Sequence, residues 1–161
     1  MPELPEIETL CRQLRPMIVG RRILSSRVID PKLQHLPTLA GNSIRSISRH
    51  GKRMVWALSD GTCLIFQMRM TGRLFWQKGG EIPPHSRLIV SFEGGSLILS
   101  DPRRFATVQL CFPPAASPVP DGLGKIDPKS LMEAARGRRL PVKSFLMDQK
   151  AVAGIGNIYA S

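Results

Sequence analysis

Apolar and polar positions follow a helical period at the start of this 161-residue chain. Apolar side chains recur at Ile7, Leu10 and Leu14, which is the spacing of one face of an α-helix. Pro5 precedes them where a first helical turn tolerates proline, because the missing N–H would have no partner there. The pattern therefore predicts a helix over residues 4–19.

The pattern changes to short apolar segments between residues 22 and 111, divided by Gly, Pro, Asp and Asn. Segments of this length between turn-forming residues are typical of strands, and the tripeptides 59–61 and 93–95 are typical of hairpin turns. The predicted strands cover residues 22–29, 43–48, 53–58, 63–68, 73–77, 87–92, 97–99 and 107–111. We therefore expect an α+β fold that begins with a helix-led, mostly antiparallel β-sandwich, with a flattened barrel as the alternative.

A Pro- and Gly-rich segment, residues 113–124, has no periodicity and is interpreted as a linker. Helical spacing returns after it. Asp127 suits the N-cap of a helix over residues 129–136, a second helix is expected over residues 141–152, and a third would begin at Ile158.

The chain accordingly divides into a first domain of residues 1–112, the linker, and a helical domain of residues 125–161. Because the last predicted elements have little left to pack against, we expect the helical domain to be incomplete.

The net charge of the chain indicates which class of partner it binds. Lys and Arg number 23 against 12 Asp and Glu, which gives a net charge of +11. The excess is spread over both parts, with +8 in residues 1–112 and +3 in residues 113–161. A folded basic surface that follows a polyanion explains this distribution better than a disordered tail, and nucleic acid is the polyanion that we expect. A generic basic surface is the alternative.

Cysteine usage and hydropathy exclude other classes. Cys11, Cys63 and Cys111 are odd in number and widely spaced, so we expect neither a disulfide framework nor a CxxC-type zinc site, and a reducing compartment. No apolar run approaches the length of a membrane span, and the acidic N-terminus does not have the pattern of a secretory signal.

The first candidate chemistry lies at the N-terminus. A small second residue normally lets Met1 be removed, which would leave Pro2 as a free secondary amine. An α-amino group has a pKa of about 7.7–8, against about 10.4 for lysine, so part of it is neutral and nucleophilic near pH 7. Attack on an aldehyde-level carbon gives an iminium, which permits elimination. Glu3 could serve beside it as a general acid; a simple helix start is the alternative interpretation.

Three further motifs combine cations with turns or apolar tips. Gly51 allows a sharp turn and the close approach of another backbone, so Lys52 would project from a turn, although a solvated basic hairpin is the alternative. Met70 could be an exposed tip that inserts between bases or a core methionine. Arg103 and Phe105 could clamp and wedge nucleic acid, or simply form a surface turn.

A last motif lies near the end of the chain. Five cations between residues 136 and 150 precede the glycine-rich turn of residues 154–157. Backbone N–H groups of such a turn bind phosphate well when they open a helix. We therefore interpret this turn as a candidate phosphate site.

Taken in order, these motifs resemble the formamidopyrimidine-DNA glycosylase family of bacterial base-excision repair enzymes. They read PELPEIE, HGK, MTG, DPRRF and MDQKAVAGIGNIYAS. The resemblance runs from residue 2 to residue 161, and Leu4 favours this branch over the endonuclease VIII group, which typically reads PEGPE. It implies a β-sandwich followed by a helix-two-turn-helix domain and a C-terminal zinc finger, with DNA between the two halves.

The resemblance also implies residue roles. Pro2 would be the Schiff-base nucleophile that attacks C1′ of the damaged nucleotide, Glu3 the acid–base group that assists sugar opening, and Lys52 the lysine that assists base release and β-elimination. The gap left by the flipped base would be filled by Met70, Arg103 and Phe105. The DNA backbone would be contacted by His85, Arg103, Arg138, Lys143 and Asn157.

These roles imply a bifunctional DNA glycosylase and AP lyase. It would remove oxidised purines, such as 8-oxoguanine and formamidopyrimidines, from double-stranded DNA and nick the strand at abasic sites by β-elimination. We expect a monomer in the bacterial cytoplasm, associated with the nucleoid and with no membrane partner. The alternatives are an inactive truncated fragment that retains weak DNA binding, and a basic RNA-binding module.

The chain departs from the family pattern in several places. Gln67 and Arg69 stand where relatives often have His and Gly, and Ala106 stands where Gly is usual. The four-cysteine zinc finger, which supplies the arginine that assists δ-elimination, is absent from the sequence. We therefore expect a C-terminally truncated member that carries no cofactor and no metal of its own.

Overall fold

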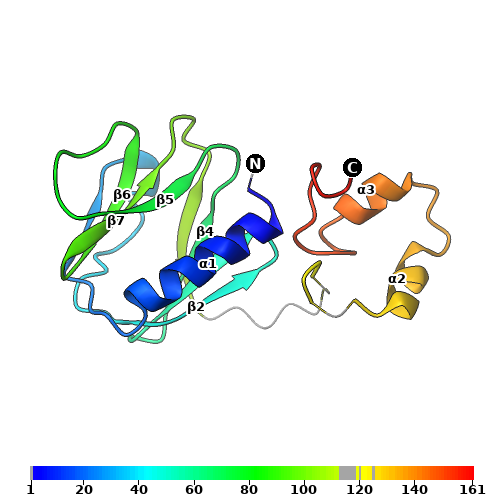
Figure 1. Ribbon diagram of the computed structural model, residues 1–161, viewed down its shortest axis with the longest axis horizontal. Helices are drawn as coiled ribbons and strands as arrows, with labels where there is room; N and C mark the ends of the chain where they lie inside the picture. The colour runs from blue at the N-terminus through cyan, green and yellow to red at the C-terminus, as the bar shows by residue number, and fades with distance from the viewer. Residues whose placement is uncertain (1, 113–118, 120, 125) are drawn as a thin grey trace.

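Two four-stranded antiparallel sheets form a sandwich in the computed structural model, which describes residues 2–112, 119, 121–124 and 126–161 (Figure 1). In sheet order, the first sheet contains β1 (Ser25–Val28), β6 (Ser86–Phe92), β7 (Gly95–Ser100) and β5 (Arg73–Gln77). The second contains β2 (Ile44–His50), β3 (Arg53–Leu58), β4 (Cys63–Gln67) and β8 (Thr107–Cys111). The predicted α+β class is confirmed, with a sandwich rather than a flattened barrel.

Helix α1 (Leu4–Ile18) leads the fold, as predicted. Its buried face includes Ile7 and Leu14 and joins the core of the sandwich, which also holds Trp56 and Phe66. The helix lies against β2, where Arg15 Nε donates a hydrogen bond to the carbonyl of Ile47 at 2.9 Å. This packing fixes the direction in which the N-terminal residues leave the sandwich.

All eight predicted strands are present, and β1 differs most from its predicted range. It begins at Ser25 because Arg22 makes only an isolated bridge to Ser43. It ends at Val28 because the N–H groups of Ile29 and Asp30 both donate to the carbonyl of Arg87 as the chain turns away. A short 3₁₀ helix, η1 (Pro31–Leu33), follows, which the pattern did not predict.

The helical part is shorter than predicted. Asp127 caps α2 (Pro128–Ala135) by accepting from two backbone N–H groups, but α3 (Val142–Met147) ends five residues before its predicted limit. The reason is Asp148, whose backbone is extended and whose carbonyl accepts from Ala151 and Val152 in a turn. The third predicted helix is a turn over residues 157–160.

The predicted linker can be followed only in part, because residues 113–118 and 120 lie outside the described residues. Its described end returns to the helical part, where Asp121 forms a parallel bridge with Ala153. Figure 1 shows the sandwich and the short helices side by side, with the start of α1 pointing at the turn that follows α3. None of the described helices is long and apolar enough to cross a membrane.

Candidate active site

The start of α1 meets the glycine-rich turn near the end of the chain. The N–H of Leu4 donates to the carbonyl of Gly154 at 3.2 Å. Gly154 has a φ of +96°, and a Cβ at this position would overlap the side chain of Leu4. Only glycine fits here, so this contact brings the two ends of the chain together.

The carboxylate of Glu3 occupies the turn that the sequence assigned to phosphate. Its Oε2 accepts from the N–H groups of Gly156 at 2.7 Å and Tyr159 at 3.3 Å, and its Oε1 accepts from Ile158 at 2.9 Å. Glu3 is 1% exposed, so water competes little for these bonds. The phosphate interpretation of these amides is therefore wrong, because a carboxylate from the same chain already fills them.

The surroundings of Glu3 favour its ionised form. Burial would raise the pKa of this carboxyl, but the N–H groups of Ile158, Tyr159 and Gly156 and the charge of Lys52 outweigh it, and the net pKa is lowered. Glu3 is thus a carboxylate at neutral pH.

Lys52 approaches the same carboxylate from the β2–β3 turn. Gly51 has a φ of +58°, and its missing side chain lets the turn lie against Ala153 and Gly154, which confirms the close approach predicted for this glycine. A Cβ on Gly156 would lie 2.7 Å from Nζ of Lys52 and would overlap Oε1 of Glu3. The absence of a side chain on Gly156 therefore leaves room for both the carboxylate and the ammonium.

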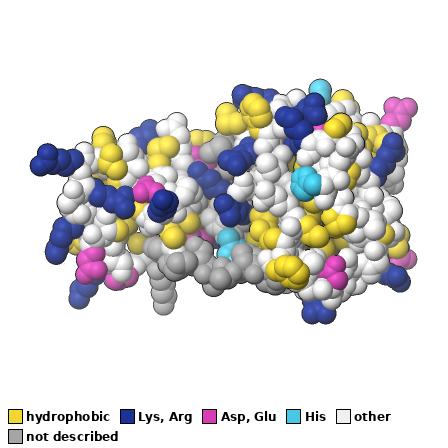
Figure 2. All heavy atoms as spheres, turned by 180° about the vertical axis from the view of Figure 1, so that it is seen from behind, with side chains coloured by type: hydrophobic (Ala, Val, Ile, Leu, Met, Phe, Trp, Pro, Cys, Tyr) yellow, Lys and Arg dark blue, Asp and Glu magenta, His cyan; other side chains and the backbone are white. Residues whose placement is uncertain are grey.

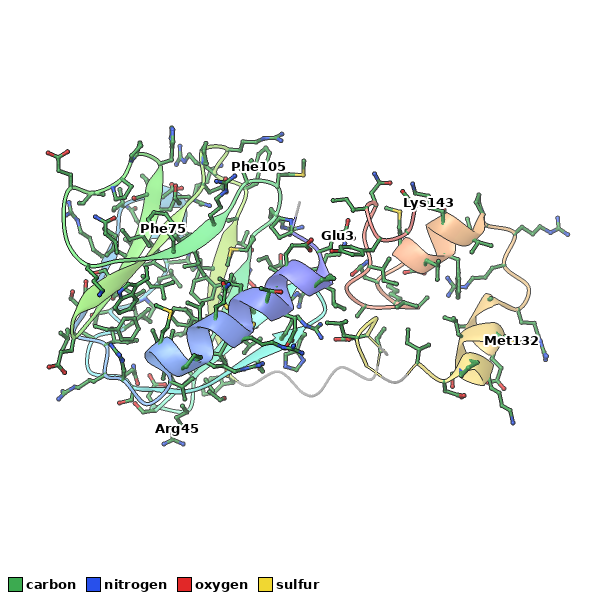
Figure 3. All side chains as sticks on the ribbon, viewed as in Figure 1. Glu3, Arg45, Phe75, Phe105, Met132 and Lys143 are labelled. Atoms are coloured by element: carbon green, nitrogen blue, oxygen red, sulfur yellow. The ribbon has the colours of Figure 1, made fainter. Side chains whose placement is uncertain are left out.

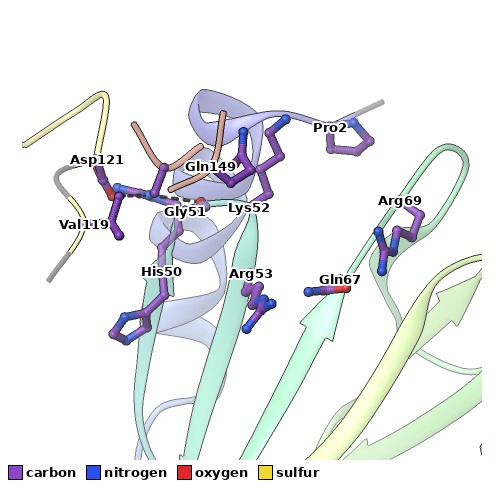
Figure 4. Close-up of a pocket in the computed structure, with 12 residues that line it drawn as sticks. Pro2, His50, Gly51, Lys52, Arg53, Gln67, Arg69, Val119, Asp121 and Gln149 are labelled. Atoms are coloured by element: carbon purple, nitrogen blue, oxygen red, sulfur yellow. Dashed lines mark hydrogen bonds and ion pairs between the residues drawn. The ribbon is translucent and has the colours of Figure 1, made fainter. Parts of the chain in front are cut away.

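A cavity of about 560 Å³ opens beside these groups (Figure 4). Pro2 and Lys52 line it together, so the structure brings the three candidate catalytic residues to one place. Strand ends supply further lining side chains, which are Arg53, Gln67 and Arg69. Figure 2 shows Lys and Arg side chains gathered at the junction between the two parts.

The arginines near this cavity divide into two groups. Arg49 is structural: it pairs with Glu8 at 3.0 Å and with Asp121 at 2.5 Å, and it donates to the carbonyl of Gly51 at 3.1 Å. It therefore ties α1 and the described end of the linker to the turn that carries Lys52. In contrast, Arg53 and Arg69 have no ion pair with any described residue.

The candidate gap-filling residues lie on two loops of the sandwich. Met70 is 48% exposed and Phe105 is 47% exposed, and the guanidinium of Arg103 lies 4.7 Å from the Phe105 ring centre. Thr71 donates its hydroxyl to the carboxylate of Asp101, which joins the two loops. The two apolar tips are therefore exposed on connected loops, and Met70 is not a core methionine.

Buried ionic groups hold the second of these loops. Asp101 is fully buried and accepts from the N–H of Ala106 at 2.7 Å. Arg87 donates to the carbonyl of Ala106 at 2.6 Å and to Asp30 at 2.5 Å. Arg104 also binds Asp30, and its hydrogen bond, together with that of Arg87, holds the pKa of Asp30 well below its usual range. Sequence reasoning missed this cluster, because its members are distant along the chain.

Backbone strain marks the same loops. Among the described residues other than glycine, positive φ occurs at Arg69, His85 and Arg104, with values of 54°, 62° and 56°. Residues other than glycine rarely adopt this conformation, which costs about 1–3 kcal/mol at each position and persists only where the surrounding structure imposes it. The three strained residues lie on three different loops: His85 is itself a candidate DNA-contacting residue, and Arg69 and Arg104 directly precede the candidates Met70 and Phe105.

The remaining candidate DNA-contacting residues lie on both parts. His85 is exposed, and its carbonyl accepts from the N–H of Asp101. Arg138 pairs with Asp148 at 2.7 Å, Lys143 donates to the hydroxyl of Ser161 at 2.9 Å, and Asn157 is exposed. Figure 3 places Phe105 on the sandwich and Lys143 on the helical part, with Glu3 between them. Among the described residues, no cluster of three or more His, Cys, Asp or Glu could hold a metal.

Comparison with known proteins agrees with this arrangement. Residues 1–108 match the family model of the formamidopyrimidine-DNA glycosylase N-terminal domain. The chain is 38% identical to the formamidopyrimidine-DNA glycosylase of Moorella thermoacetica and 40% identical to that of Methylococcus capsulatus, with 99% and 100% of this chain and 65% of each relative aligned. It thus spans about two thirds of their length.

Comparison with solved structures also finds members of this family. The chain superposes with a TM-score of 0.89 on Lactococcus lactis Fpg in a complex with DNA that contains an abasic site. That protein is 31% identical, and the superposition covers 99% of this chain and 64% of the other. The similarity therefore includes both the sandwich and the helical part.

Proposed function

Because the chain belongs to the formamidopyrimidine-DNA glycosylase family, we propose that it acts in base-excision repair on double-stranded DNA, as a DNA glycosylase and AP lyase. Its substrates would be nucleotides with oxidised purines and the abasic sites that remain after base removal. One observation carries the proposal: Pro2 and Lys52 line one cavity, and the buried carboxylate of Glu3 interacts with the Lys52 ammonium behind it.

Pro2 supplies the nucleophile once Met1 has been removed. The nitrogen lone pair attacks C1′ of the nucleotide, and the base leaves with the electrons of the glycosidic bond. The nitrogen loses its proton to a base, and its lone pair then opens the bond between C1′ and O4′; O4′ takes up a proton, and Pro2 is left as an iminium. The iminium draws electrons from C2′, so that loss of a C2′ proton expels the 3′ phosphate and nicks the strand.

Glu3 acts as a carboxylate in this scheme. Its lowered pKa means that it holds negative charge on the residue that follows Pro2 in the chain, and a fixed negative charge in this part of the site would stabilise the iminium. The hydrogen bonds from Gly156, Ile158 and Tyr159 fix that charge in place. The geometry thus supports charge stabilisation or proton acceptance by Glu3 more than the donation of a proton.

Lys52 supplies the proton donor. Its ammonium lies beside the Glu3 carboxylate and faces the same cavity as Pro2, so it can protonate the departing base or the sugar oxygen. Met70 and Phe105 are exposed on loops of the sandwich and can enter the space that a flipped nucleotide leaves in the duplex.

An incision assay tests the proposal. Duplexes that contain a single 8-oxoguanine or a single abasic site are incubated with the protein, and the products are separated on a denaturing gel. We expect nicking of the abasic duplex with the 3′ end left by β-elimination. Lys52→Gln should lose this product, and Arg45→Gln, an equal charge change elsewhere on the sandwich, should retain it. Binding of both duplexes without any nick would contradict the proposal and leave a DNA-binding protein without lyase activity.

A further inference from the structure

Two of the three cysteines are neighbours across a sheet, although they are far apart in the sequence. Cys63 begins β4 and Cys111 ends β8, and these two residues are paired in the antiparallel register. Both are free thiols. Neither belongs to the cavity or to the loops described above.

The register places the two side chains on one face. Residues directly opposite each other in an antiparallel pair point to the same side, and their Cα atoms are about 4.5–5.5 Å apart. The next pair along, Leu64 and Leu110, faces the core of the sandwich. Because successive residues alternate, Cys63 and Cys111 lie together on the outer face of the second sheet. Disulfides join Cα atoms about 4.4–6.8 Å apart, a range that overlaps the spacing of directly paired residues.

Of the two thiols, Cys111 is the one that solvent and a dissolved oxidant can reach. Strand β8 is at the edge of its sheet, and Cys111 is partly exposed whereas Cys63 is 4% exposed. Burial raises the pKa of Cys63, and the neighbouring thiol of Cys111 raises it further. Cys11 differs from both: it is fully buried, and burial raises its pKa to about 11.

We propose that Cys63 and Cys111 form a redox-active dithiol site that a small-molecule disulfide converts into an intramolecular disulfide. The Cys111 thiol loses its proton to solvent, and the thiolate attacks one sulfur of the oxidant and expels one thiolate. The Cys63 thiolate, formed in the same way, attacks the Cys111 sulfur of the mixed disulfide and expels the second. The protein loses two electrons and two protons, and the oxidant becomes two thiols.

The site is remote from the proposed chemistry. Cys63 and Gln67 lie at opposite ends of β4, and only the Gln67 end lines the cavity. The new bond would enclose the segment from residue 63 to residue 111, which carries Met70, Arg103 and Phe105. Oxidation would thus restrain the part of the fold that presents these residues without filling the cavity.

Thiol counting with peptide mapping tests the proposal. The folded 161-residue chain is incubated with oxidised glutathione at pH 8, denatured, alkylated with iodoacetamide and digested. The expected result is a fall from three free thiols to one, an intact mass, taken before alkylation, that is about 2 Da lower from the loss of two hydrogens, and a cross-linked peptide pair that contains residues 63 and 111. The variant Cys11→Ser should give the same cross-link.

The single variants separate the proposal from simple thiol exposure. Cys63→Ser should stop at the mixed disulfide on Cys111, and Cys111→Ser should keep Cys63 reduced. The proposal is overturned if the wild-type chain keeps three free thiols, or if it holds a lasting glutathione adduct on Cys111 while Cys63 stays free. The wild-type map alone decides the matter should a serine variant fail to fold.

Discussion

The N–H of Gly156 donates a hydrogen bond to the Glu3 carboxylate at 2.7 Å, across 153 positions of the chain. A candidate catalytic carboxylate is therefore also the group that fastens the helical part to the start of α1. The same contact sets the ionisation of Glu3 and the position of the helical part. Catalysis and the attachment of the two parts are expected to respond together when this contact is changed.

Removing the Glu3 charge should weaken the junction between the two parts. In Glu3→Gln one acceptor oxygen becomes an NH₂ group, which faces backbone donors instead of accepting from them. We expect the free energy of unfolding to fall by about 1–3 kcal/mol and amide hydrogen exchange to increase at residues 156–159. Glu81→Gln, at an exposed position, is the control that should change neither quantity.

Acid should reproduce the effect of this variant. The pKa of Glu3 is lower in the folded chain than its ordinary value of 4.5, so its contribution to stability is fully present above that value. The contribution is lost as the pH falls from there through the folded pKa. The difference in urea unfolding between wild type and Glu3→Gln should therefore be constant near neutral pH and shrink below about pH 4.5. A difference that grows in acid would show that the sign of the shift is wrong.

A single methyl group at Gly156 should damage the site. In Gly156→Ala the new Cβ would overlap Oε1 of Glu3 and lie 2.7 Å from Nζ of Lys52, so both groups must move. Misplacement on this scale costs on the order of 10- to 100-fold in rate, which single-turnover cleavage of an abasic duplex can measure. Gly124→Ala is the matched control, because its Cβ would make only ordinary contact, 3.4 Å from Asp121.

The link between the two loops should matter for recognition of a gap in the duplex. Thr71→Val keeps the shape of the side chain but removes the hydroxyl that binds Asp101. We expect binding to a duplex with a tetrahydrofuran abasic analogue to weaken by about 2- to 10-fold, with binding to intact duplex unchanged. Thr38→Val, at an exposed position whose hydroxyl accepts from the N–H of Ala40, should behave as wild type. Equal weakening on both duplexes would mean that the link does not act through Met70 and Phe105.

The two arginines without ion pairs should contribute to the salt dependence of binding. Arg53 and Arg69 both line the cavity, so we expect each to neutralise a DNA phosphate. Loss of one phosphate contact lowers the slope of log K against log salt by about 0.9, so Arg53→Gln and Arg69→Gln together should lower it by about 2. Arg45→Gln is the control, since Figure 3 places Arg45 on the far side of the sandwich from Glu3. Equal slopes in the double variant and the wild type would remove these residues from the interface.

The sequence predicted the elements well where local chemistry decides them. Strand β3 lies between two turns and has the predicted bounds, and Gly51 adopts the positive φ that its position in a basic turn suggested. The short length of α3 was not predictable from periodicity, because Val152 continues the apolar spacing after Asp148 has ended the helix.

The parts of the site that depend on contacts between residues distant in the sequence could not be predicted. In the sequence Arg49 and Arg53 look alike, yet the first is held by Glu8 and Asp121 and the second is free of ion pairs with described residues. The amides of the glycine-rich turn looked available to a phosphate, and only the fold shows that Glu3 fills them. The register of Cys63 with Cys111 is another such case.

Covalent trapping on an abasic duplex tests the central claim, that a free Pro2 amine is the nucleophile. The protein is incubated with the duplex and sodium borohydride at low salt, and the adduct is located by peptide mapping. The account predicts a protein–DNA band whose attachment maps to the Pro2 nitrogen, and a much weaker band when Met1 is retained. A folded protein that binds the duplex but gives no band, or a band that maps to Lys52, would contradict it.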